Sequence, residues 1–145
     1  MFERILYPTD FSTMARKTFD FIEKLKQSGT MEVVVLNVLD IRDIDILGTS
    51  YSGQDFLPVQ QAFEDKAKEE ISYVGNELRQ FGFRVKTRVE KGIPFREILR
   101  VAEEEDVSLI VIASHGKSNI SEMFLGSVSE KVIRKSKKPV LVIKR

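Results

Sequence analysis

The residues Ile112–Ser129, which read IASHGKSNISEMFLGSVS, decide the fold. The apolar run that ends at Ala113 is typical of a strand, a polar loop with Gly116 follows, and Gly126 opens a segment with helical spacing. A strand, a glycine-containing loop and a helix N-terminus can bind phosphate, because the first N–H groups of a helix have no partner within it. The stretch therefore predicts a βα unit that either binds phosphate or uses its glycine only for a tight turn.

Two common phosphate motifs are excluded by spacing. Gly116-Lys117-Ser118 looks like the end of a P-loop, but that motif needs a glycine five residues before Gly116, where the chain has Val111. No helical pattern starts at Ser118, and Gly-x-Gly-x-x-Gly, the dinucleotide fingerprint, is absent. The phosphate hypothesis therefore depends on the longer spacing between Gly116 and Gly126.

The rest of the chain alternates between strand-like and helix-like patterns. We expect strands at Arg4–Tyr7, Glu32–Leu39, Phe83–Val89, Ser108–Ala113 and Val140–Lys144. We expect helices over Ser12–Gln27, from Val59 to Phe81, from Gly92 onward, and over Gly126–Ser136. This alternation predicts an α/β fold with a parallel sheet and helices on both of its faces.

The segment Asp40–Pro58 has no clear period, and we expect it to be irregular. Unstructured connections of this length are uncommon in compact domains and are often functional. It is interpreted either as a surface insertion or as a lid or partner-binding loop beside the ligand site.

Length and composition limit the class of protein. The chain has 145 residues, which predicts one domain over residues 1–145. A net charge of +1 gives no electrostatic case for binding nucleic acid or an anionic membrane. No apolar run approaches the roughly 20 residues of a spanning helix, and the start of the chain does not resemble a signal peptide. The absence of cysteine fits a reducing compartment, so we expect a cytoplasmic protein.

The spacing Ala113-x-x-Gly116, nine residues, then Gly126-Ser127 resembles the ATP-binding members of the universal stress protein family. Those members carry Gly-x-x-Gly, nine residues, then Gly-Ser or Gly-Thr. The resemblance extends over the whole chain, through Ile5–Ser12, Leu36–Val38, Gly126–Val132 and Lys138–Val142. One departure is Ala113 in place of the first glycine, where an added methyl group can narrow the ligand site.

The resemblance implies a Rossmann-like open sheet of five strands in the order 3-2-1-4-5. In that order the winding direction reverses between the first and fourth strands, and ligands bind at the carboxyl ends of strands at such a switch point. Those ends carry Pro8-Thr9-Asp10 and Ala113–Gly116, so the two motifs are expected to meet in one crevice.

We expect the phosphates to bind at the start of the last helix. The groups expected there are Gly126, Ser127 and the N–H groups of Val128 and Ser129, with hydroxyl donors from Ser127 and Ser129. Ser127 can instead serve only as a helix cap. Gly116 would let its loop lie against the phosphates or the ribose.

The family resemblance also implies a nucleoside end. It places Asp10 against ribose or adenine, where a carboxylate can accept two hydrogen bonds, and the backbone of Val38 against adenine. The alternative for Asp10 is helix capping. We expect Mg²⁺ to accompany ATP, held mainly by phosphates and water.

His115 is the only histidine, and the sequence offers no cysteine or tight acidic cluster with which it could hold a metal. We expect it to contribute a backbone group or a hydrogen bond at the loop. Lys117 either neutralises phosphate charge or points to water.

The sequence contains no recognisable catalytic constellation, so we expect no activity beyond slow ATP hydrolysis. The main hypothesis is an ATP-binding, stress-linked regulatory protein. The alternative is a homodimeric interaction module of the same fold that binds no nucleotide, which Ala113 favours. A third class, an adenylate-using enzyme, would need a substrate pocket from Asp40–Pro58.

We also expect a homodimer joined through strand five, residues Pro139–Arg145. Strands three and five are the sheet edges, and exposed edges invite pairing with other chains. Charged side chains protect strand three, at Arg84, Lys86 and Arg88, whereas Val140–Ile143 is apolar on both faces. Antiparallel pairing of this strand with the same strand of a second copy would form a dimer with two-fold symmetry. The alternative is a monomer in which a loop covers the edge.

Overall fold

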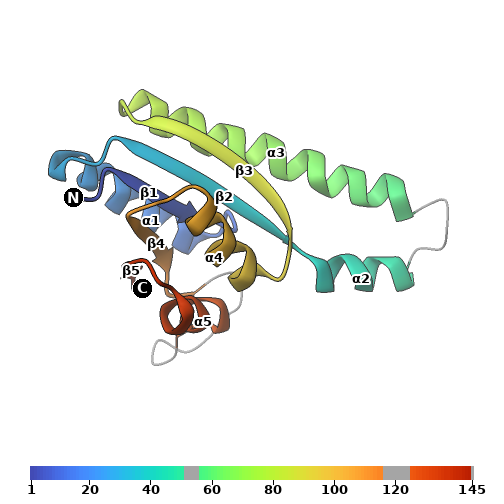
Figure 1. The fold of residues 1–145 in the computed structure, drawn as a ribbon. Helices are drawn as coiled ribbons and strands as arrows, with labels where there is room; N and C mark the ends of the chain where they lie inside the picture. The colour runs from blue at the N-terminus through green and yellow to red at the C-terminus, as the bar shows by residue number, and fades with distance from the viewer. Residues whose placement is uncertain (51–55, 116–124, 145) are drawn as a thin grey trace.

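The structure is a computed structural model that describes residues 1–50, 56–115 and 125–144. It contains one parallel sheet of five strands in the order β3-β2-β1-β4-β5 (Figure 1). The strands are β1 (Arg4–Pro8), β2 (Glu32–Asp40), β3 (Arg84–Gly92), β4 (Leu109–Ala113) and β5 (Val140–Ile143). The α/β fold and the strand order expected from the sequence are confirmed.

Helices cover both faces of the sheet (Figure 1). They are α1 (Thr13–Leu25), α2 (Ile41–Ser50), α3 (Phe56–Gln80), α4 (Pro94–Glu104) and α5 (Ser127–Lys135), with a short 3-10 helix, η1, at Lys26–Ser28. One core packs α1 and α3 against Tyr7 and Val35. The other packs α4 and α5 against Leu6 and Leu36. Alternate residues of each strand therefore enter opposite cores.

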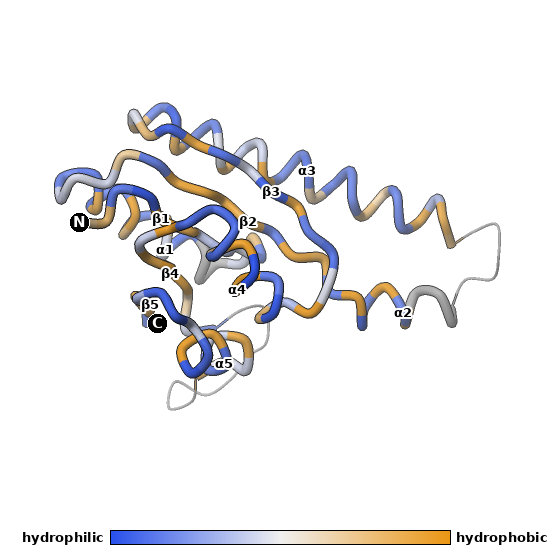
Figure 2. Tube along the Cα trace, viewed as in Figure 1, coloured by the Kyte–Doolittle hydropathy of each residue, from blue (hydrophilic) through white to orange (hydrophobic). Residues whose placement is uncertain are grey.

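The central strands are apolar on both faces because both faces are covered. Val33, Val34, Val35 and Leu36 of β2 are all completely buried. Figure 2 shows β2 as a nearly continuous hydrophobic strand and β3, at the edge, as a mixed one. An unbroken apolar run is what a buried parallel strand requires.

The expectation that Asp40–Pro58 is irregular is wrong for its first part, which forms α2. Asp40 accepts a hydrogen bond from the Arg42 N–H (3.0 Å), so its carboxylate satisfies one of the unpaired donors at the helix start. The last part is helical too, because α3 already begins at Phe56. Pro58 lies in its first turn, where a missing N–H removes no helical hydrogen bond.

Helix α3 packs on the sheet only over its later part. Ala67, Ile71 and Leu78 of the predicted apolar stripe are buried, as expected. Phe63 is half exposed, because the first turns of α3 extend beyond the end of the sheet (Figure 1). Its aromatic ring is thus left to line the cavity described below rather than the core.

The outward side of β3 is less uniform than its alternating sequence indicates. Arg84 and Lys86 are exposed, but the Arg88 side chain is only 17% exposed because it forms ion pairs with Glu90, Glu104 and Glu105.

Across the described ranges, no helix combines the length and hydropathy needed to cross a membrane.

Candidate functional site

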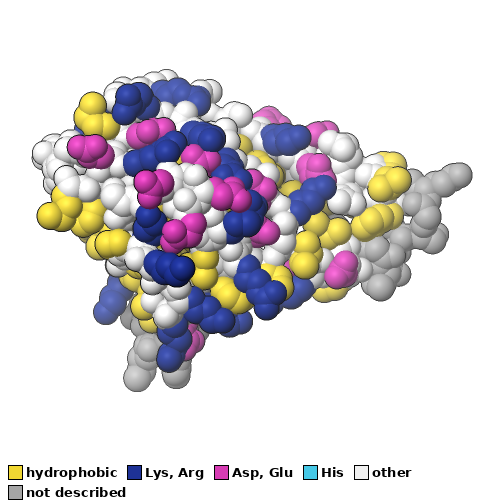
Figure 3. All heavy atoms as spheres, in the orientation of Figure 1, with side chains coloured by type: hydrophobic (Ala, Val, Ile, Leu, Met, Phe, Trp, Pro, Cys, Tyr) yellow, Lys and Arg dark blue, Asp and Glu magenta, His cyan; other side chains and the backbone are white. Residues whose placement is uncertain are grey.

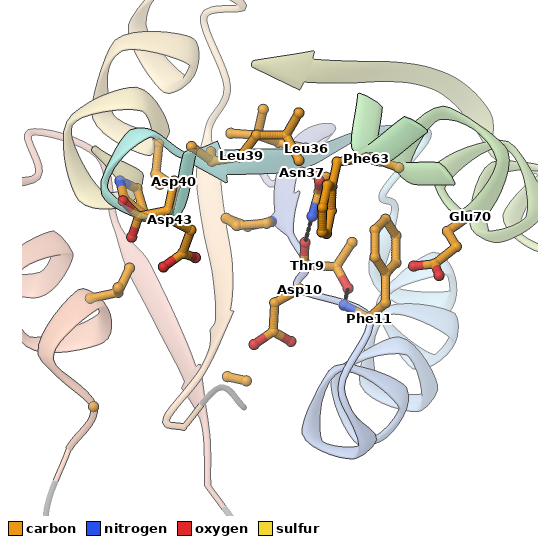
Figure 4. A pocket seen from close by; sticks show the side chains of 18 of the residues that line it. Thr9, Asp10, Phe11, Leu36, Asn37, Leu39, Asp40, Asp43, Phe63 and Glu70 are labelled. Atoms are coloured by element: carbon orange, nitrogen blue, oxygen red, sulfur yellow. Dashed lines mark hydrogen bonds between the residues drawn. The ribbon is translucent and has the colours of Figure 1, made fainter. Parts of the chain in front are cut away.

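A cavity of about 700 Å³ opens at the carboxyl ends of β1, β2 and β4 (Figure 4). Its volume falls within the ~300–1,000 Å³ typical of small-molecule sites. It lies where the winding reverses between β1 and β4. Its wall includes most of the predicted site residues, namely Pro8, Thr9, Asp10, Val38, Ala113, His115, Gly126, Ser127, Val128 and Ser129. Gly116 and Lys117 lie outside the described residues.

The loop between β1 and α1 is held by its own side chains. The hydroxyl of Thr9 accepts the Phe11 N–H (3.1 Å), and Asp10 Oδ1 accepts the Ser12 N–H (3.0 Å). These bonds hold Phe11 at φ +62°, a left-handed conformation that is uncommon for a bulky residue. The second carboxylate oxygen of Asp10 bonds to no described residue, and the side chain projects into the cavity (Figure 4). Asp10 thus has one carboxylate oxygen bonded within the loop and a side chain that faces the cavity.

The start of α5 leaves three backbone donors unpaired. Within the described part of the chain, the N–H groups of Ser127, Val128 and Ser129 make no hydrogen bond, and helical bonding begins with Glu130 N–H to Gly126 O (3.0 Å). Three N–H groups at the positive end of a helix dipole favour an anion. These donors lie on the cavity wall, as expected for a phosphate site.

Two other groups expected to contact phosphate are already used by the fold. The Gly126 N–H donates to Ser114 O (2.7 Å), and the Ser129 hydroxyl donates to Ala113 O (2.6 Å). Both bonds hold α5 against the end of β4. The Ser127 hydroxyl, in contrast, is exposed and bonds to no described residue.

Gly126 is required by the packing of α5 against the chain after β4. A Cβ atom at this position would lie 3.0 Å from the Ser114 carbonyl oxygen, a backbone atom with little freedom to move. The glycine therefore allows α5 to approach the chain after β4. A larger residue at position 126 would disturb the fold whether or not a ligand binds.

His115 is buried, and its Nδ1 lies 2.8 Å from the Ser114 hydroxyl. Its Nε2 has no hydrogen-bond partner among the described residues. In the same part of the chain, no group of three or more His, Cys, Asp or Glu residues is placed to hold a metal.

The sequence predicted the outer wall of the cavity only in part, because one of the two interpretations of Asp40–Pro58 placed that segment beside the ligand site. The wall includes Asn37 at the end of β2, Asp40 and Ile44 near α2, and Phe63 of α3. The Arg42 side chain beside Asp40 holds the pKa of that carboxyl below its usual value, so Asp40 stays ionised and is paired within the protein. A further sequence signal was available at Asn37, a polar residue directly after four aliphatic strand residues.

The family model and the individual relatives that match this chain point to the same protein family. The model of the universal stress protein family matches residues 1–144. Universal stress protein MJ0577 of Methanocaldococcus jannaschii is 39% identical, in an alignment covering 100% of this chain and 96% of that protein. Universal stress protein YxiE of Bacillus subtilis is 33% identical, in an alignment covering 99% of this chain and 100% of that protein.

Solved structures share the fold. The structure of MJ0577 has a TM-score of 0.90 and 40% identity, covering 100% of this chain and 97% of that one. The universal stress protein from Archaeoglobus fulgidus in complex with dAMP has a TM-score of 0.64 and 23% identity, and the match covers 99% of this chain and 98% of that one.

Proposed function

The chain belongs to the universal stress protein family, and we propose that it is an ATP-binding regulatory protein of the stress response. In this proposal residues 1–145 form one nucleotide-binding domain, and ATP lies at the switch point between β1 and β4. The observation that carries the proposal is the set of unpaired N–H groups at Ser127, Val128 and Ser129, which share one cavity with Asp10.

The cavity suggests how each part of ATP would be held. The phosphates would accept hydrogen bonds from the start of α5, and the free oxygen of Asp10 would accept one from a ribose hydroxyl. Adenine would lie against Val38 and the apolar outer wall. An adenine nucleotide is bound by the A. fulgidus protein of the same fold. Mg²⁺ would be held by the phosphates and water, the coordination that it commonly adopts with nucleotides.

We propose that the isolated protein hydrolyses ATP slowly at most. Phosphoryl transfer needs cationic groups around the γ-phosphate. Among the described residues that line the cavity, Lys66 is the only lysine or arginine. It belongs to α3, which covers the opposite face of the sheet from α5. Turnover near the ~10 s⁻¹ of typical enzymes, abolished by an Asp10 substitution, would contradict this part of the proposal.

The test is calorimetric titration with ATP and Mg²⁺. Asp10→Ala removes charge-assisted hydrogen bonds worth ~1.5–3 kcal/mol, which predicts a roughly 10- to 100-fold loss of affinity. Asp10→Asn is the matched control, because it keeps an oxygen for the Ser12 N–H but lowers the charge, so its loss should be smaller. Gly126 variants are unsuitable because they disturb packing against Ser114.

A wild-type protein that binds no ATP at millimolar concentration would contradict the proposal. It would favour the alternative of a homodimeric interaction module that binds no nucleotide. Ala113, in place of the glycine expected from ATP-binding relatives, is the observation that favours this alternative. A cytoplasmic location stays a prediction in either case.

We also propose that β5, within the segment Pro139–Arg145, joins two copies of the chain. In the described sheet β5 pairs only with β4, and Leu141 and Val142 are only partly buried. Antiparallel pairing with a second β5 would satisfy the backbone groups of this edge. Light scattering coupled to size exclusion would contradict the dimer if it found a 16.6 kDa species at tens of micromolar protein.

A further inference from the structure

Three cations gather around the ring of Phe95 at the start of α4. Lys131 Nζ, Lys135 Nζ and the Arg96 guanidinium lie 5.0, 5.2 and 5.7 Å from the ring centre. All three residues are exposed, and none of them forms an ion pair with a described residue. The ring itself is partly buried against the core beneath α4 and α5. These charges therefore face solvent without a partner in the described part of the chain.

Positive charge is concentrated at this place, although the chain as a whole is nearly neutral. The segment Ser127–Pro139 holds five lysine or arginine residues and one acidic residue, whereas the net charge of the whole chain is +1. Arg134 is paired with Glu130, and Lys138 with Asp106. Basic side chains predominate over α5 in the view of Figure 3. Such a patch attracts a group of negative charges on another molecule.

The fold alone does not explain why these cations stand where they do. Arg96 lies in the first turn of α4, where the helix dipole disfavours a positive charge. Lys131 and Lys135 are four residues apart on α5, where like charges repel each other. Attraction to the ring of Phe95 offsets part of this repulsion. A bound carboxylate would stabilise all three positions.

An acidic protein segment fits the patch better than nucleic acid does. Proteins that bind unpaired bases offer free aromatic faces on which the bases stack. The Phe95 ring is partly buried and has three cations around it, so it is not a free platform. Carboxylates need only the cationic groups, which are the exposed part of this patch.

The patch adjoins the backbone donors proposed to hold phosphate. Lys131 lines a small hollow together with Ser127 and Val128, whose N–H groups make no hydrogen bond to a described residue. A triphosphate at these donors would bring several negative charges close to Lys131 and would repel further acids there. ATP in the cavity and an acidic segment on the patch would therefore weaken each other's binding by the same factor.

We propose that Arg96, Lys131 and Lys135 dock an acidic segment of a partner protein, and that ATP bound in the cavity releases it. The three cations pair with aspartate or glutamate side chains that lie close together on the partner. The release by ATP rests on the proposed function and gives the bound nucleotide a way to control a partner.

Docking is measured by the fluorescence anisotropy of a labelled peptide of eight glutamate residues, at low salt and without nucleotide. The triple variant Arg96→Gln, Lys131→Gln, Lys135→Gln should bind this peptide about 10-fold more weakly than the wild type, because each exposed ion pair contributes little alone. A peptide of eight glutamine residues should bind neither protein.

A second triple variant is the matched control. Lys17→Gln, Lys24→Gln, Lys68→Gln removes the same charge from three exposed lysines that also form no ion pair with a described residue. Lys24 even lies over an aromatic ring, 5.0 Å from the centre of Phe21. This control should bind the peptide as the wild type does, and thermal unfolding checks that both variants fold. Equal losses in the two triple variants would show that only net charge matters and would overturn the inference.

The release is tested by adding ATP with Mg²⁺ to the peptide complex. Saturating ATP should weaken peptide binding to the wild type several-fold. Asp10→Ala should need roughly 10- to 100-fold more ATP for the same release, because it weakens binding in the cavity and leaves the patch intact. Release of the peptide from Asp10→Ala at wild-type ATP concentrations would show that ATP binds the patch itself, and would contradict the proposed coupling.

Three further results separate this inference from the proposed function. If calorimetry finds no ATP binding, the proposed function and the release both fail, and the two triple variants still decide the docking. If ATP binds but leaves the peptide in place, the inference is overturned and the proposed function stands. If a single-stranded oligonucleotide binds more tightly than the peptide and is lost in the Arg96, Lys131 and Lys135 variant, the patch serves nucleic acid and the inference is wrong.

Discussion

Two charged surfaces flank helix α4, and they are built in opposite ways. Over β3 and the end of α4, acidic and basic side chains intermingle, whereas basic side chains predominate over α5 (Figure 3). We call the first the Glu105 network, formed by Arg4, Lys86, Arg88, Arg100, Glu32, Glu90, Glu97, Glu104 and Glu105. We call the second the Phe95 cluster, formed by Phe95, Arg96, Lys131 and Lys135.

The Glu105 network pairs its charges within the protein. The buried carboxylate of Glu105 contacts Lys86 Nζ at 2.7 Å, Arg88 Nη1 at 3.0 Å and Arg4 Nη2 at 3.1 Å. The hydrogen bond from Lys86 outweighs the effect of burial and lowers the pKa of Glu105 below its usual value. These contacts join β1, β3 and the end of α4, so we expect this network to stabilise the fold.

The Phe95 cluster leaves its cations without acidic partners. Lys131 Nζ, Lys135 Nζ and the Arg96 guanidinium lie 5.0, 5.2 and 5.7 Å from the centre of the Phe95 ring. In the described part of the chain none of these cations forms an ion pair. Lys131 also lines a small hollow with Ser127 and Val128, beside the donors proposed to hold phosphate. The comparison indicates that charges paired within the protein stabilise the fold, whereas the unpaired cations of the Phe95 cluster are available to an anionic ligand.

The largest expected effect is from Glu105→Ala, which leaves Arg88 and Arg4 without their shared carboxylate. Breaking a buried ion pair costs ~3–5 kcal/mol. We expect the unfolding free energy to fall by about 2–4 kcal/mol, less than for a fully buried pair, because the side chains of Lys86 and Arg4 are partly exposed to solvent. Urea unfolding measures it. Glu104→Ala, at the more exposed end of the network, is the control and should cost less. Equal losses would contradict the central role given to Glu105.

The same carboxylate predicts how stability depends on pH. Because the pKa of Glu105 is lowered by folding, its contribution is complete above the unfolded pKa of ~4.3 and is lost as the pH falls through the folded pKa. The difference in unfolding free energy between wild type and Glu105→Gln should be constant over about pH 6–8 and should shrink below about pH 4.3. A difference that stays constant in acid would show that Glu105 is not acting through its charge.

Neither charged surface could be predicted from the sequence, although the sheet could. Apolar runs such as Val33–Leu36 indicate buried strands because that property is local. Arg4 and Glu105 are 101 positions apart and meet only when β1 and β4 pair. Lys131 and Lys135 look like an ordinary solvated face until α5 packs near Phe95.

The candidate site shows the same division. The glycine-serine pattern predicts the N–H donors at the start of α5, since any helix start leaves such groups unpaired. It does not predict that the Gly126 N–H and the Ser129 hydroxyl bond to the end of β4. That outcome depends on the distance between two elements. Helix α2 was missed because Gly48, Thr49 and Ser50 weaken its pattern, although Asp40 supplies a cap.

A smaller effect tests whether the Phe95 cluster serves the ligand. Lys131→Gln should weaken ATP binding about two- to five-fold, because a cation near phosphate contributes at most ~1 kcal/mol in water. The affinity of the variant should also depend less on salt than that of the wild type. Lys68→Gln, an exposed lysine of α3 outside the cavity wall, is the control. Unchanged affinity and unchanged salt dependence would restrict the cluster to packing α4 against α5.

The smallest expected effect on stability comes from giving a cation of the Phe95 cluster an acidic partner. Lys131→Glu places an acid four residues before Lys135, the favourable order for an ion pair on a helix, and removes a like-charge pair. We expect the unfolding free energy to rise by about 0.3–0.5 kcal/mol, while ATP affinity falls further than in Lys131→Gln. The gain in stability is partly offset by the lost contact of a cation with the Phe95 ring. Urea unfolding and calorimetric titration of the same preparation measure both quantities. If stability and affinity fell together, the unpaired charges would belong to the fold after all, and the contrast with the Glu105 network would be lost.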